Sequence, residues 1–407
     1  MNIFIFGGNW QNRGDESAIR AMIDELKIIY PESNIRIHVN NGPLHQFAYN
    51  DIVYVEKFYR PGKKNILLSL LYEIFIISNG KINLLYGELK KRADFFMKTL
   101  KWSDIILYAP GGPMIGDLYK AGSLINCFKL IINSKKPYAF FAPSMGPFTK
   151  NKGIIRRILN NSKLICLRES ISKEYVQSLN INKEPIVTLD SAFQHSIDLE
   201  YNESLLKKYT ELNNFLKNKK VIGVTITDLQ WHKSYKDNQI SENIKRTFKK
   251  TIQHLHDMGY AILFIPQLFG TANDKDYMDS FAIDNCFTMS DEYDCYFQQY
   301  VISKLYCVIG MRYHSNIFSA KMGTPFISVA YEQKMEGFMK KANLFDYCIM
   351  INELNSDNLI SKFNLLVSNY DSYKEQLIMD SKKYMSESHK TTELVSELID
   401  NLINKNN

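Results

Sequence analysis

The stretch Leu305-Tyr306-Cys307-Val308-Ile309-Gly310-Met311-Arg312-Tyr313-His314-Ser315 passes from an apolar segment into a polar turn. Its first five residues are apolar and partly β-branched, and the glycine after them predicts a buried strand that ends in a turn. Residues 315–322 are compatible with a helix. Arg312 and His314 are therefore expected between the carboxyl end of a strand and the start of a helix. Open α/β sheets bind ligands at this position, and the helix dipole favours anions there.

The residues that follow extend this pattern. Residues 326–329 predict the next strand, and Lys334 and Glu336 are expected in the loop beyond it. Two successive parallel strands would present a guanidinium, an imidazole and an ammonium group to one small, highly charged anion. In an arbitrary sequence, an arginine and a histidine after a strand are more often capping and packing residues, and this alternative stays open on these residues alone.

Short apolar segments alternate with helical segments along the chain. We expect strands at residues 3–6, 35–39, 52–55, 105–108, 138–142, 164–167, 186–188, 221–226 and 262–265, and helices at 15–29, 118–133 and 170–179. This alternation predicts βαβ units and mostly parallel sheets. A chain of 407 residues is too long for one typical core. The predicted fold is α/β, with two Rossmann-like domains facing a cleft in a GT-B-like arrangement. Residues 1–200 form the first domain, 201–220 a linker, and 221–407 the second domain with C-terminal helices.

The amino-acid composition indicates which kinds of binding partner and cellular environment suit this chain. Lys and Arg exceed Asp and Glu by 50 to 43, a mild basic balance that suits anionic ligands or an anionic membrane surface. The positive charge is too diffuse to predict a nucleic-acid partner. The six cysteines include no Cys-x-x-Cys pair, and several lie in apolar segments, which predicts reduced core residues. Because the first strand begins without a secretory signal, we expect a cytoplasmic location.

The longest apolar segment spans residues 66–77 and is interrupted by a serine and a glutamate. It is far shorter than the ~20 residues that cross a bilayer. A helix packed on the core is expected. The flanking residues Arg60, Lys63 and Lys64, and the later run 90–92, also suit a surface that rests on anionic lipid, so peripheral contact with the inner face of the plasma membrane is an alternative.

The motif Gly310-Met311-Arg312-Tyr313-His314 and the later Lys334-Met335-Glu336-Gly337-Phe338 resemble the polysaccharide pyruvyl transferase family. Members of that family carry a strand followed by Gly-Met-Arg-x-His, then a strand and a Lys-x-x-Gly-Phe-like loop. The resemblance extends over most of the chain. Further motifs in the family's order are Gly7-Gly8-Asn9, residues 12–19, Gly111-Gly112, residues 144–147, residues 167–170 and residues 190–193.

The resemblance implies transfer of a pyruvyl group from phosphoenolpyruvate to two hydroxyls of one sugar, which forms a cyclic ketal. The acceptor would belong to a cell-surface polysaccharide or to its lipid-linked precursor. Phosphoenolpyruvate is the donor substrate, and no metal or cofactor is expected. A donor with a carboxylate and a phosphate suits forked guanidinium groups and an ammonium group.

Residues in the matching positions would bind this donor. Arg312, Arg168 and Lys334 would contact its anionic groups, with Gly310 and Tyr313 beside them. For Arg168, an ion pair to Glu169 or a helix end is an equal alternative. His314 would act as general acid and base, because a histidine titrates near neutral pH.

Glu336 would orient His314 or Lys334, or deprotonate the sugar. It could equally be a solvated loop acid.

The first domain would hold the acceptor. Asn9, Asn12 and Asp15 would bind its hydroxyls, close to the glycine-rich turn Gly111-Gly112. Asp15 or Asp117 is the candidate base for a sugar hydroxyl, although Asp15 could be only the N-cap of the following helix.

Two other functions remain open. A GT-B glycosyltransferase would use a nucleotide sugar, with Glu292 or Asp294 on the donor ribose. A non-catalytic anion-binding module would keep the fold without turnover. Trp231 follows the strand at 221–226, where it could stack on a sugar ring or simply pack at the rim.

Overall fold

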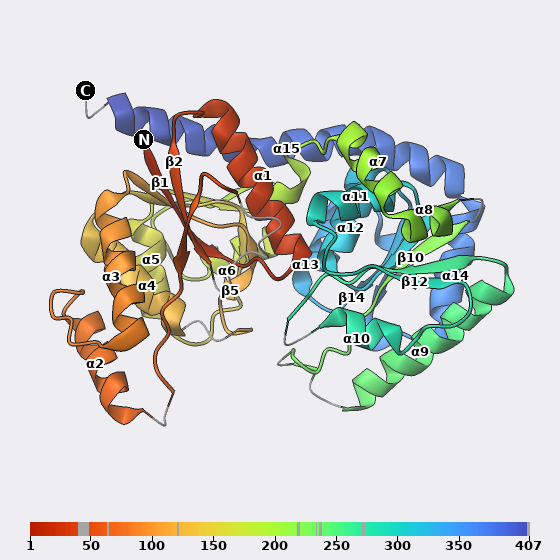
Figure 1. The fold of residues 1–407 in the computed structure, drawn as a ribbon, viewed down its shortest axis with the longest axis horizontal. Helices are drawn as coiled ribbons and strands as arrows, with labels where there is room; N and C mark the ends of the chain where they lie inside the picture. Colours follow the sequence, from red (N-terminus) through yellow and green to blue (C-terminus); the bar gives the residue numbers. More distant parts are fainter. Residues whose placement is uncertain are drawn as a thin grey trace. The chain divides into compact units, whose positions relative to one another are not determined.

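The structure is a computed structural model of the chain. It describes residues 1–39, 49–62, 65–119, 122–217, 220–232, 234–235, 238–270 and 273–404, so Lys63 and Lys64 lie outside the described residues. The chain divides into two compact units. The first comprises Met1–Trp10, Ala18–Ser191 and His389–Asn407, and the second comprises Gln11–Ser17 and Ala192–Ser388. Each unit is an α/β structure built on a parallel sheet (Figure 1).

The first unit contains a seven-stranded sheet with the order β3-β2-β1-β4-β6-β8-β9, in which every neighbouring pair is parallel. The strands are β1 (Asn2–Gly8), β2 (Asn34–Val39), β3 (Val53–Glu56), β4 (Ile105–Tyr108), β6 (Tyr138–Phe140), β8 (Leu164–Leu167) and β9 (Ile186–Val187). β5 (Gly111–Ile115) and β7 (Pro143–Met145) form a separate pair. The helices are α1 (Arg13–Ile29), α2 (Ile66–Ile77), α3 (Gly87–Trp102), α4 (Gly122–Ser134), α5 (Lys152–Asn161) and α6 (Ser170–Gln177).

Side chains of β1 alternate between the two faces of this sheet, as the pleat of a strand requires. Phe4 and Phe6 enter a core that includes aromatic residues of α3 and α4. Ile3 and Ile5 enter a second core, which includes apolar residues of α1 and the end of α15 (Tyr370–Asn404). Helices therefore cover both faces of the sheet, which explains why its central strands β4 and β6 are apolar along their whole length.

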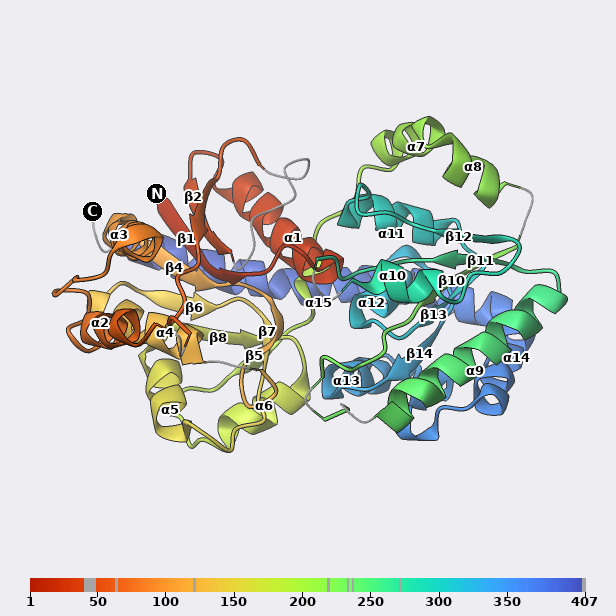
Figure 2. The ribbon, with the colours of Figure 1, turned by 60° about the horizontal axis from the view of Figure 1, so that its bottom comes forward.

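The second unit contains a six-stranded parallel sheet with the order β12-β11-β10-β13-β14-β15. The strands are β10 (Val221–Thr225), β11 (Ala261–Phe264), β12 (Cys286–Thr288), β13 (Cys307–Gly310), β14 (Phe326–Ala330) and β15 (Cys348–Met350). The helices are α7 (Leu199–Lys208), α8 (Thr210–Leu216), α9 (Asn238–Asp257), α10 (Asp274–Asp279), α11 (Cys295–Ser303), α12 (Tyr313–Met322), α13 (Gln333–Lys341), α14 (Ser356–Ser368) and the first part of α15. Figure 2 shows α11 on one face of this sheet and α9 and α14 on the other. The sheet has the Rossmann strand order, numbered along the chain as 3-2-1-4-5-6.

The structure confirms the predicted α/β class and corrects several local expectations. Lys334 and Glu336 were expected in a loop but lie in the first turn and a half of α13. The alternative that Asp15 serves only as an N-cap does not apply, because α1 begins at Arg13 and the Oδ1 atom of Asn12 accepts hydrogen bonds from the backbone N–H groups of Gly14 (2.9 Å) and Asp15 (3.4 Å). The strands β12 and β15 were not expected, since three residues are too few to show an apolar pattern.

The cysteines confirm the expectation from their spacing. All six are free thiols, and all but Cys286 are buried. Burial raises the pKa of Cys127 to about 12, with a smaller opposing effect from Lys57. These thiols are therefore packing residues that stay protonated at neutral pH.

The segment Gln11–Ser17 belongs to the second unit because Arg13 anchors it there. The buried Arg13 guanidinium donates from Nε to the carbonyl oxygen of Tyr293 (2.9 Å) and from Nη2 to that of Asp291 (2.8 Å). Its Nη1 forms an ion pair with Glu16 at 2.9 Å, and neither side chain is exposed. The backbone N–H of Arg13 also donates to the carbonyl oxygen of Gln267 (2.8 Å).

Replacement of this anchor should destabilise the protein. We expect Arg13→Ala to lower the free energy of unfolding by about 3–5 kcal/mol, because it leaves the Glu16 carboxylate buried without its partner. Arg92→Ala is the matched control, since Arg92 pairs with Glu56 and Glu88 at the surface and should cost less than about 1 kcal/mol. Urea denaturation followed by circular dichroism measures both. An equal effect of the two substitutions would show that the segment is not anchored through Arg13.

Candidate functional site

The strand order of the second unit defines a switch point between β10 and β13. These strands pair in parallel, and the chain runs outward from them in opposite directions across the sheet. Ligands of such sheets bind beyond the carboxyl ends of the strands at this point. Thr225 ends β10, and Arg312 is the second residue after β13. The sequence prediction that Arg312 lies at a strand end before a helix is confirmed, because it is the N-cap residue of α12.

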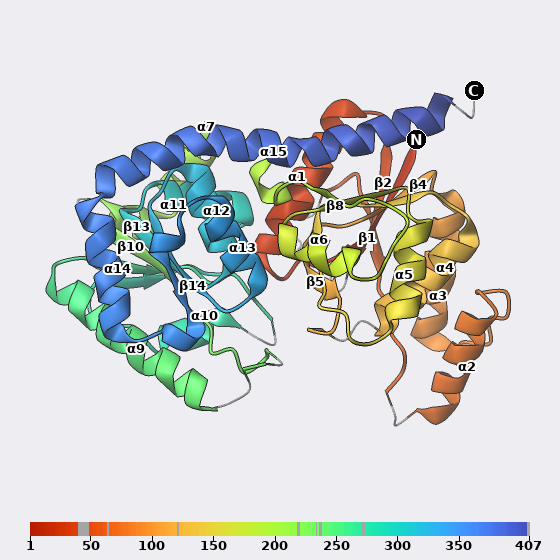
Figure 3. The same cartoon turned by 180° about the vertical axis from the view of Figure 1, so that it is seen from behind.

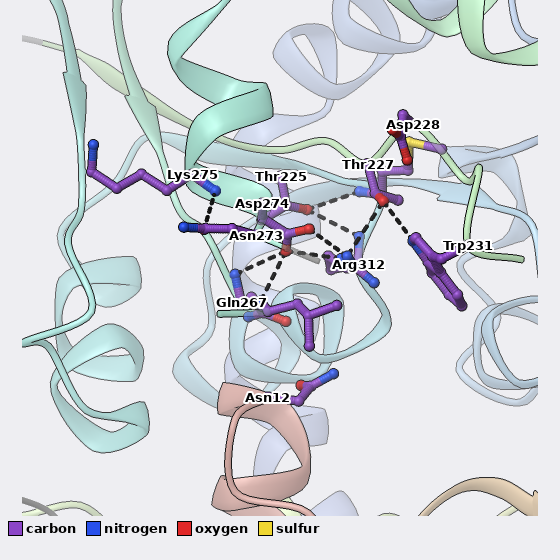
Figure 4. A network of polar contacts seen from close by, with 12 residues as sticks. Asn12, Thr225, Thr227, Asp228, Trp231, Gln267, Asn273, Asp274, Lys275 and Arg312 are labelled. Carbon is purple, nitrogen blue, oxygen red and sulfur yellow. Dashed lines mark hydrogen bonds and ion pairs between the residues drawn. The ribbon is translucent and has the colours of Figure 1, made fainter. Parts of the chain in front are cut away.

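Arg312 is held by a carboxylate and a hydroxyl (Figure 4). Its Nε atom donates to Oδ2 of Asp274 (3.0 Å), and its Nη2 atom donates to Oδ1 of the same carboxylate and to Oγ1 of Thr227 (3.3 Å). The carbon at the centre of the guanidinium lies 5.2 Å from the ring centre of Trp231. Burial alone would lower the pKa of Arg312, but Asp274 and Tyr331 raise it above the ordinary value. The guanidinium is therefore charged, fixed in orientation and largely removed from water.

The Asp274 carboxylate also fixes the loop after β11. Its Oδ2 atom accepts hydrogen bonds from the backbone N–H groups of Gln267 (3.1 Å) and Leu268 (2.9 Å). Asp274 is the first residue of α10, and its side chain is 3% exposed. The carboxylate thus joins the loops that follow β11 and β13.

Thr225 fixes the turn that carries Arg312. Its hydroxyl accepts hydrogen bonds from the backbone N–H groups of Met311 (2.9 Å) and Arg312 (3.1 Å), and it lies 2.9 Å from the Ser315 hydroxyl. Gly310 is required here, because a Cβ atom at this position would lie 1.9 Å from Oδ1 of Asn316. These contacts therefore fix the backbone conformation between β13 and α12.

A pocket of about 500 Å³ opens beside this network within the second unit. Arg312, Asp274 and Thr227 line it together with the ring of Trp231 and the half-buried Asp228. The indole N–H of Trp231 donates to Oγ1 of Thr227 (3.0 Å), which fixes the ring. The pocket thus offers a guanidinium, an aromatic face and carboxylates, a set suited to a ligand that carries both an anionic group and hydroxyls.

His314 is buried in the first turn of α12 and contacts the segment anchored by Arg13. A Cβ atom at Gly14 would lie 1.9 Å from Nδ1 of His314 and 2.2 Å from its Cγ. The Tyr313 ring meets the imidazole edge-on, with 4.9 Å between ring centres. The backbone of Gly14 therefore forms one wall against the imidazole, and only a glycine leaves room for it.

Lys334 is tied to a carboxylate that the sequence analysis did not single out. Its Nζ atom lies 2.5 Å from Oε2 of Glu332, the residue before α13, and 5.6 Å from the ring centre of Tyr313. The Nε2 atom of His232 lies 3.4 Å from the other Glu332 oxygen. Burial tends to raise the pKa of Glu332, but Lys334 and His232 outweigh it, and the pKa lies well below its usual range. Glu332 is therefore an anion between two basic groups.

Three predicted site residues of the second unit have other surroundings than expected. Glu336 forms an ion pair with Lys340 (2.6 Å), and its role beside His314 or Lys334 stays a prediction. Asn12 uses its side-chain oxygen to cap α1. Asp15 is half-buried in the first turn of α1, next to the glycine that touches His314.

The other predicted site residues belong to the first unit. Arg168 is fully buried, where it forms ion pairs with Asp190 (2.6 Å) and Glu169 (3.7 Å) and donates to the Ser144 hydroxyl (2.7 Å). The ion pair with Glu169 is the alternative that the sequence left open, and a donor contact by Arg168 stays a prediction.

Asp117 accepts hydrogen bonds from the backbone N–H groups of Thr149 and Lys150, which makes it part of a turn. Gly111 starts β5, with Gly112 after it, and Asn9 follows β1. Their shared role in binding the acceptor stays a prediction.

Sequence reasoning missed Asp274 and Glu332. Asp274 was not visible because it lies 38 positions from Arg312 and begins a helix of only six residues. Glu332 had a signal, since it lies three residues after an expected strand, as Arg312 does. Among the described residues, no group of three or more His, Cys, Asp or Glu side chains is arranged to hold a metal ion.

Comparison with known proteins identifies related sequences. The profile of the family described as polysaccharide pyruvyl transferase matches residues 12–333. The amylovoran biosynthesis protein AmsJ of Erwinia amylovora is 24% identical over 405 residues, which covers 93% of this chain and 94% of that protein. Both matches extend across the two units.

Solved structures with the same fold are more distant in sequence. The UDP-GlcNAc 2-epimerase of Neisseria meningitidis superposes with a TM-score of 0.57 at 13% identity, covering 98% of this chain and 100% of that one. The MnaA–UDP complex of S. aureus gives a TM-score of 0.63 at 12% identity, covering 98% and 97%. At such identities the likeness establishes the fold alone, and it confirms the predicted GT-B-like class.

The buried Glu332 makes stability depend on pH in a defined direction. A carboxylate whose pKa is lowered by folding stabilises the protein above its unfolded pKa of about 4.3 and loses that effect as the pH falls further. We expect Glu332→Gln to cost about 3 kcal/mol at pH 7, because Lys334 loses its counter-ion. The difference from the unsubstituted protein should shrink steadily below about pH 4. Thermal unfolding at a series of pH values measures it, and a difference independent of pH would contradict the assignment.

Proposed function

The match over residues 12–333 places the chain in the polysaccharide pyruvyl transferase family, and from this membership we propose that it transfers a pyruvyl group from phosphoenolpyruvate to a sugar. In this proposal the acceptor is a sugar unit of a polysaccharide or of its lipid-linked precursor, and the product is a cyclic pyruvate ketal. The similarity to a protein of amylovoran biosynthesis supports a role in making an extracellular polysaccharide.

The observation that carries the proposal is the buried guanidinium of Arg312 at the switch point. Asp274 and Thr227 use its Nε and Nη2 atoms, so the planar group is aligned before any ligand arrives. A guanidinium aligned in this way binds a carboxylate or phosphate with little loss of side-chain freedom. It also lines the pocket of about 500 Å³, which gives the donor room beside it. Arg312 therefore binds the anionic groups of phosphoenolpyruvate.

His314 is the proton donor and acceptor in this proposal. It lies two residues after Arg312, at the amino end of α12, where the helix dipole favours an anion. Its burial between the Tyr313 ring and the Gly14 backbone excludes water from the imidazole. Lys334 supplies a further positive charge near Tyr313, and Glu332 holds it in place.

The reaction proceeds by proton transfer to carbon. The His314 imidazolium gives its proton to the methylene carbon of the enol, whose π electrons form the new C–H bond. A first sugar hydroxyl attacks the electron-poor C2 atom and loses its proton. The bond between C2 and the bridging oxygen then breaks, phosphate leaves with that electron pair, and a second hydroxyl of the same sugar closes the ketal ring.

The protons of the reaction balance without any further reactant. Two hydroxyl protons are released, of which one restores His314 and the other is taken up by phosphate or solvent. No electron acceptor or donor is consumed. Asp15, half-buried next to Gly14, is the proposed base for a sugar hydroxyl.

A binding and turnover experiment tests the function. Phosphoenolpyruvate should raise the thermal unfolding midpoint, whereas UDP and UDP-sugars should not. With acceptors ending in galactose, glucose, mannose or N-acetylmannosamine, one of them should support phosphate release and gain the mass of one pyruvyl ketal. Protection by UDP together with sugar transfer from a UDP-sugar would instead support a glycosyltransferase.

The role of His314 has a direct test. We expect His314→Ala to retain the fold and the thermal shift by phosphoenolpyruvate, and to lower phosphate release at least about 100-fold, which is the usual contribution of a general acid. Arg312→Lys is the complementary variant, which should weaken the thermal shift because the forked geometry is lost. A turnover rate in His314→Ala near that of the unsubstituted enzyme would refute the assignment.

Gly14 should act by positioning His314. The new methyl group of Gly14→Ala would overlap the imidazole, so we expect a fall of about tenfold or more in kcat with the donor still bound. Gly153→Ala is the matched control, because a Cβ atom there has no atom within 4 Å. Steady-state kinetics with phosphoenolpyruvate as the varied substrate separates kcat from KM. A Gly14→Ala enzyme with unchanged kcat would show that the imidazole does not need its present place.

A further inference from the structure

Helix α2 carries apolar side chains on both of its sides. Tyr72, Phe75 and Ile76 are buried in the core of the first unit. On the other side, a stripe of large apolar side chains is 39–76% exposed, formed by Ile66, Leu67, Leu70, Ile74 and Ile77. Leu70, Ile74 and Ile77 follow the adjacent pair Ile66 and Leu67 at intervals of three to four residues, which places all five on one side of the helix. A helix that packed only on the core would have polar residues there.

The exposed apolar residues concentrate around this helix. Of the 21 large apolar side chains that are exposed among the described residues, nine lie within residues 59–86. Besides the stripe they are Tyr59, Ile82, Leu84 and Tyr86. Single exposed apolar residues are ordinary, but a patch of this kind marks a surface that meets another apolar phase or a partner.

The positive charge of the chain is concentrated in the same segment. Residues 57–102 contain ten Lys or Arg and three Asp or Glu, a net charge of +7. The whole chain also has a formal net charge of +7, so the remaining residues balance to zero. The one charged residue of α2, Glu73, is paired with Arg60 at 3.0 Å. The apolar stripe is therefore part of a basic segment.

A lysine-lined pocket lies next to the carboxyl end of α2. It has a volume of about 390 Å³, and its lining includes Asn79, Lys81, Lys101, Asn133 and Lys136, with no Asp or Glu. The structure gives none of the three ammonium groups an ion pair with a described residue. Three like charges around one hollow attract an anion such as a phosphate.

The geometry points to an anionic lipid bilayer as the partner of this face. We infer that the exposed stripe of α2 lies in the plane of the bilayer, between head groups and acyl chains, and that Lys81, Lys101 and Lys136 bind a lipid phosphate. α2 packs on α4 at the periphery of the first unit (Figures 1 and 3). At 12 residues, or roughly 18 Å, it is too short to cross a bilayer. In the described part of the chain, no helix is long and apolar enough to do so.

Vesicle flotation with the full chain tests this inference without donor or sugar, so its outcome is separate from that of the proposed reaction. The protein should float with vesicles of phosphatidylcholine and 30% phosphatidylglycerol and should stay in solution with pure phosphatidylcholine. Binding should weaken as salt is added, because surface charges are screened. No flotation with the anionic vesicles would overturn the inference.

The apolar contribution is tested by a matched pair of triple variants. Ile66→Ser with Leu70→Ser and Ile77→Ser should lower vesicle binding at least about tenfold and leave the unfolding midpoint unchanged. The control changes equally exposed residues elsewhere, Ile28→Ser with Leu199→Ser and Met379→Ser, and should bind as the unsubstituted chain does. If the first variant instead turned a dimer into a monomer, the face would be an interface between copies and the inference would fail.

The lysine pocket is tested by charge reversal. Lys81→Glu with Lys101→Glu and Lys136→Glu should lower binding to anionic vesicles by at least about 100-fold. Lys249→Glu with Lys250→Glu and Lys383→Glu gives the same net charge and should have only a small effect. Equal losses in both variants would show that net charge alone acts. Protection against unfolding by inorganic phosphate without vesicle binding would identify a site for a soluble anion and refute the bilayer as partner.

Discussion

The arrangement of the second unit depends on one carboxylate, that of Asp274. It accepts hydrogen bonds from Arg312 and from the backbone of Gln267 and Leu268. Gln267 in turn accepts a hydrogen bond from the backbone of Arg13, the anchor of the segment that touches His314. A buried guanidinium without a counter-ion would cost several kcal/mol of stability. The guanidinium of Arg312 can therefore be buried only because the Asp274 carboxylate is held beside it. A continuous series of hydrogen bonds thus connects the Arg312 guanidinium to the segment that contacts the His314 imidazole.

The sequence predicted the elements of the fold better than their contacts. Strands buried on both faces are apolar throughout, which made β1, β4, β10 and β13 visible, and the strand-helix alternation implied parallel sheets. The motif around Arg312 identified the family and the correct strand end. The strands β12 and β15 were not predicted, because three residues are too few to show the apolar pattern of a strand.

The partners of the site residues were less predictable, for a physical reason. An ion pair between residues 38 positions apart leaves no trace in local periodicity, so Asp274 could not be assigned to Arg312. The capping role that was left open for Asp15 belongs to Asn12, because both are good cap residues and only the register of α1 decides between them. Lys334 was placed in a loop because the length of the turn after β14 is not encoded in any apolar pattern.

The two units differ in the kind of ligand surface that they present. The second unit offers a deeply buried, oriented charge, which suits recognition of one small molecule. The first unit offers apolar side chains and unpaired ammonium groups at its surface, which suit an extended and fluid partner. In the function and the membrane contact proposed above, the second unit would carry the chemistry and the first unit would set the location.

The first unit is assembled from both ends of the chain. Val395 and Ile399 of α15 belong to the core beneath β1, and the hydroxyls of Thr188 and Thr391 are 2.7 Å apart. During synthesis the first 191 residues leave the ribosome long before these late residues exist. Until then, one apolar face of the sheet in the first unit is incompletely covered. Residues 192–388, by contrast, supply the rest of the second unit as one continuous segment. The first unit can therefore be completed only after the whole chain of the second unit has been synthesised.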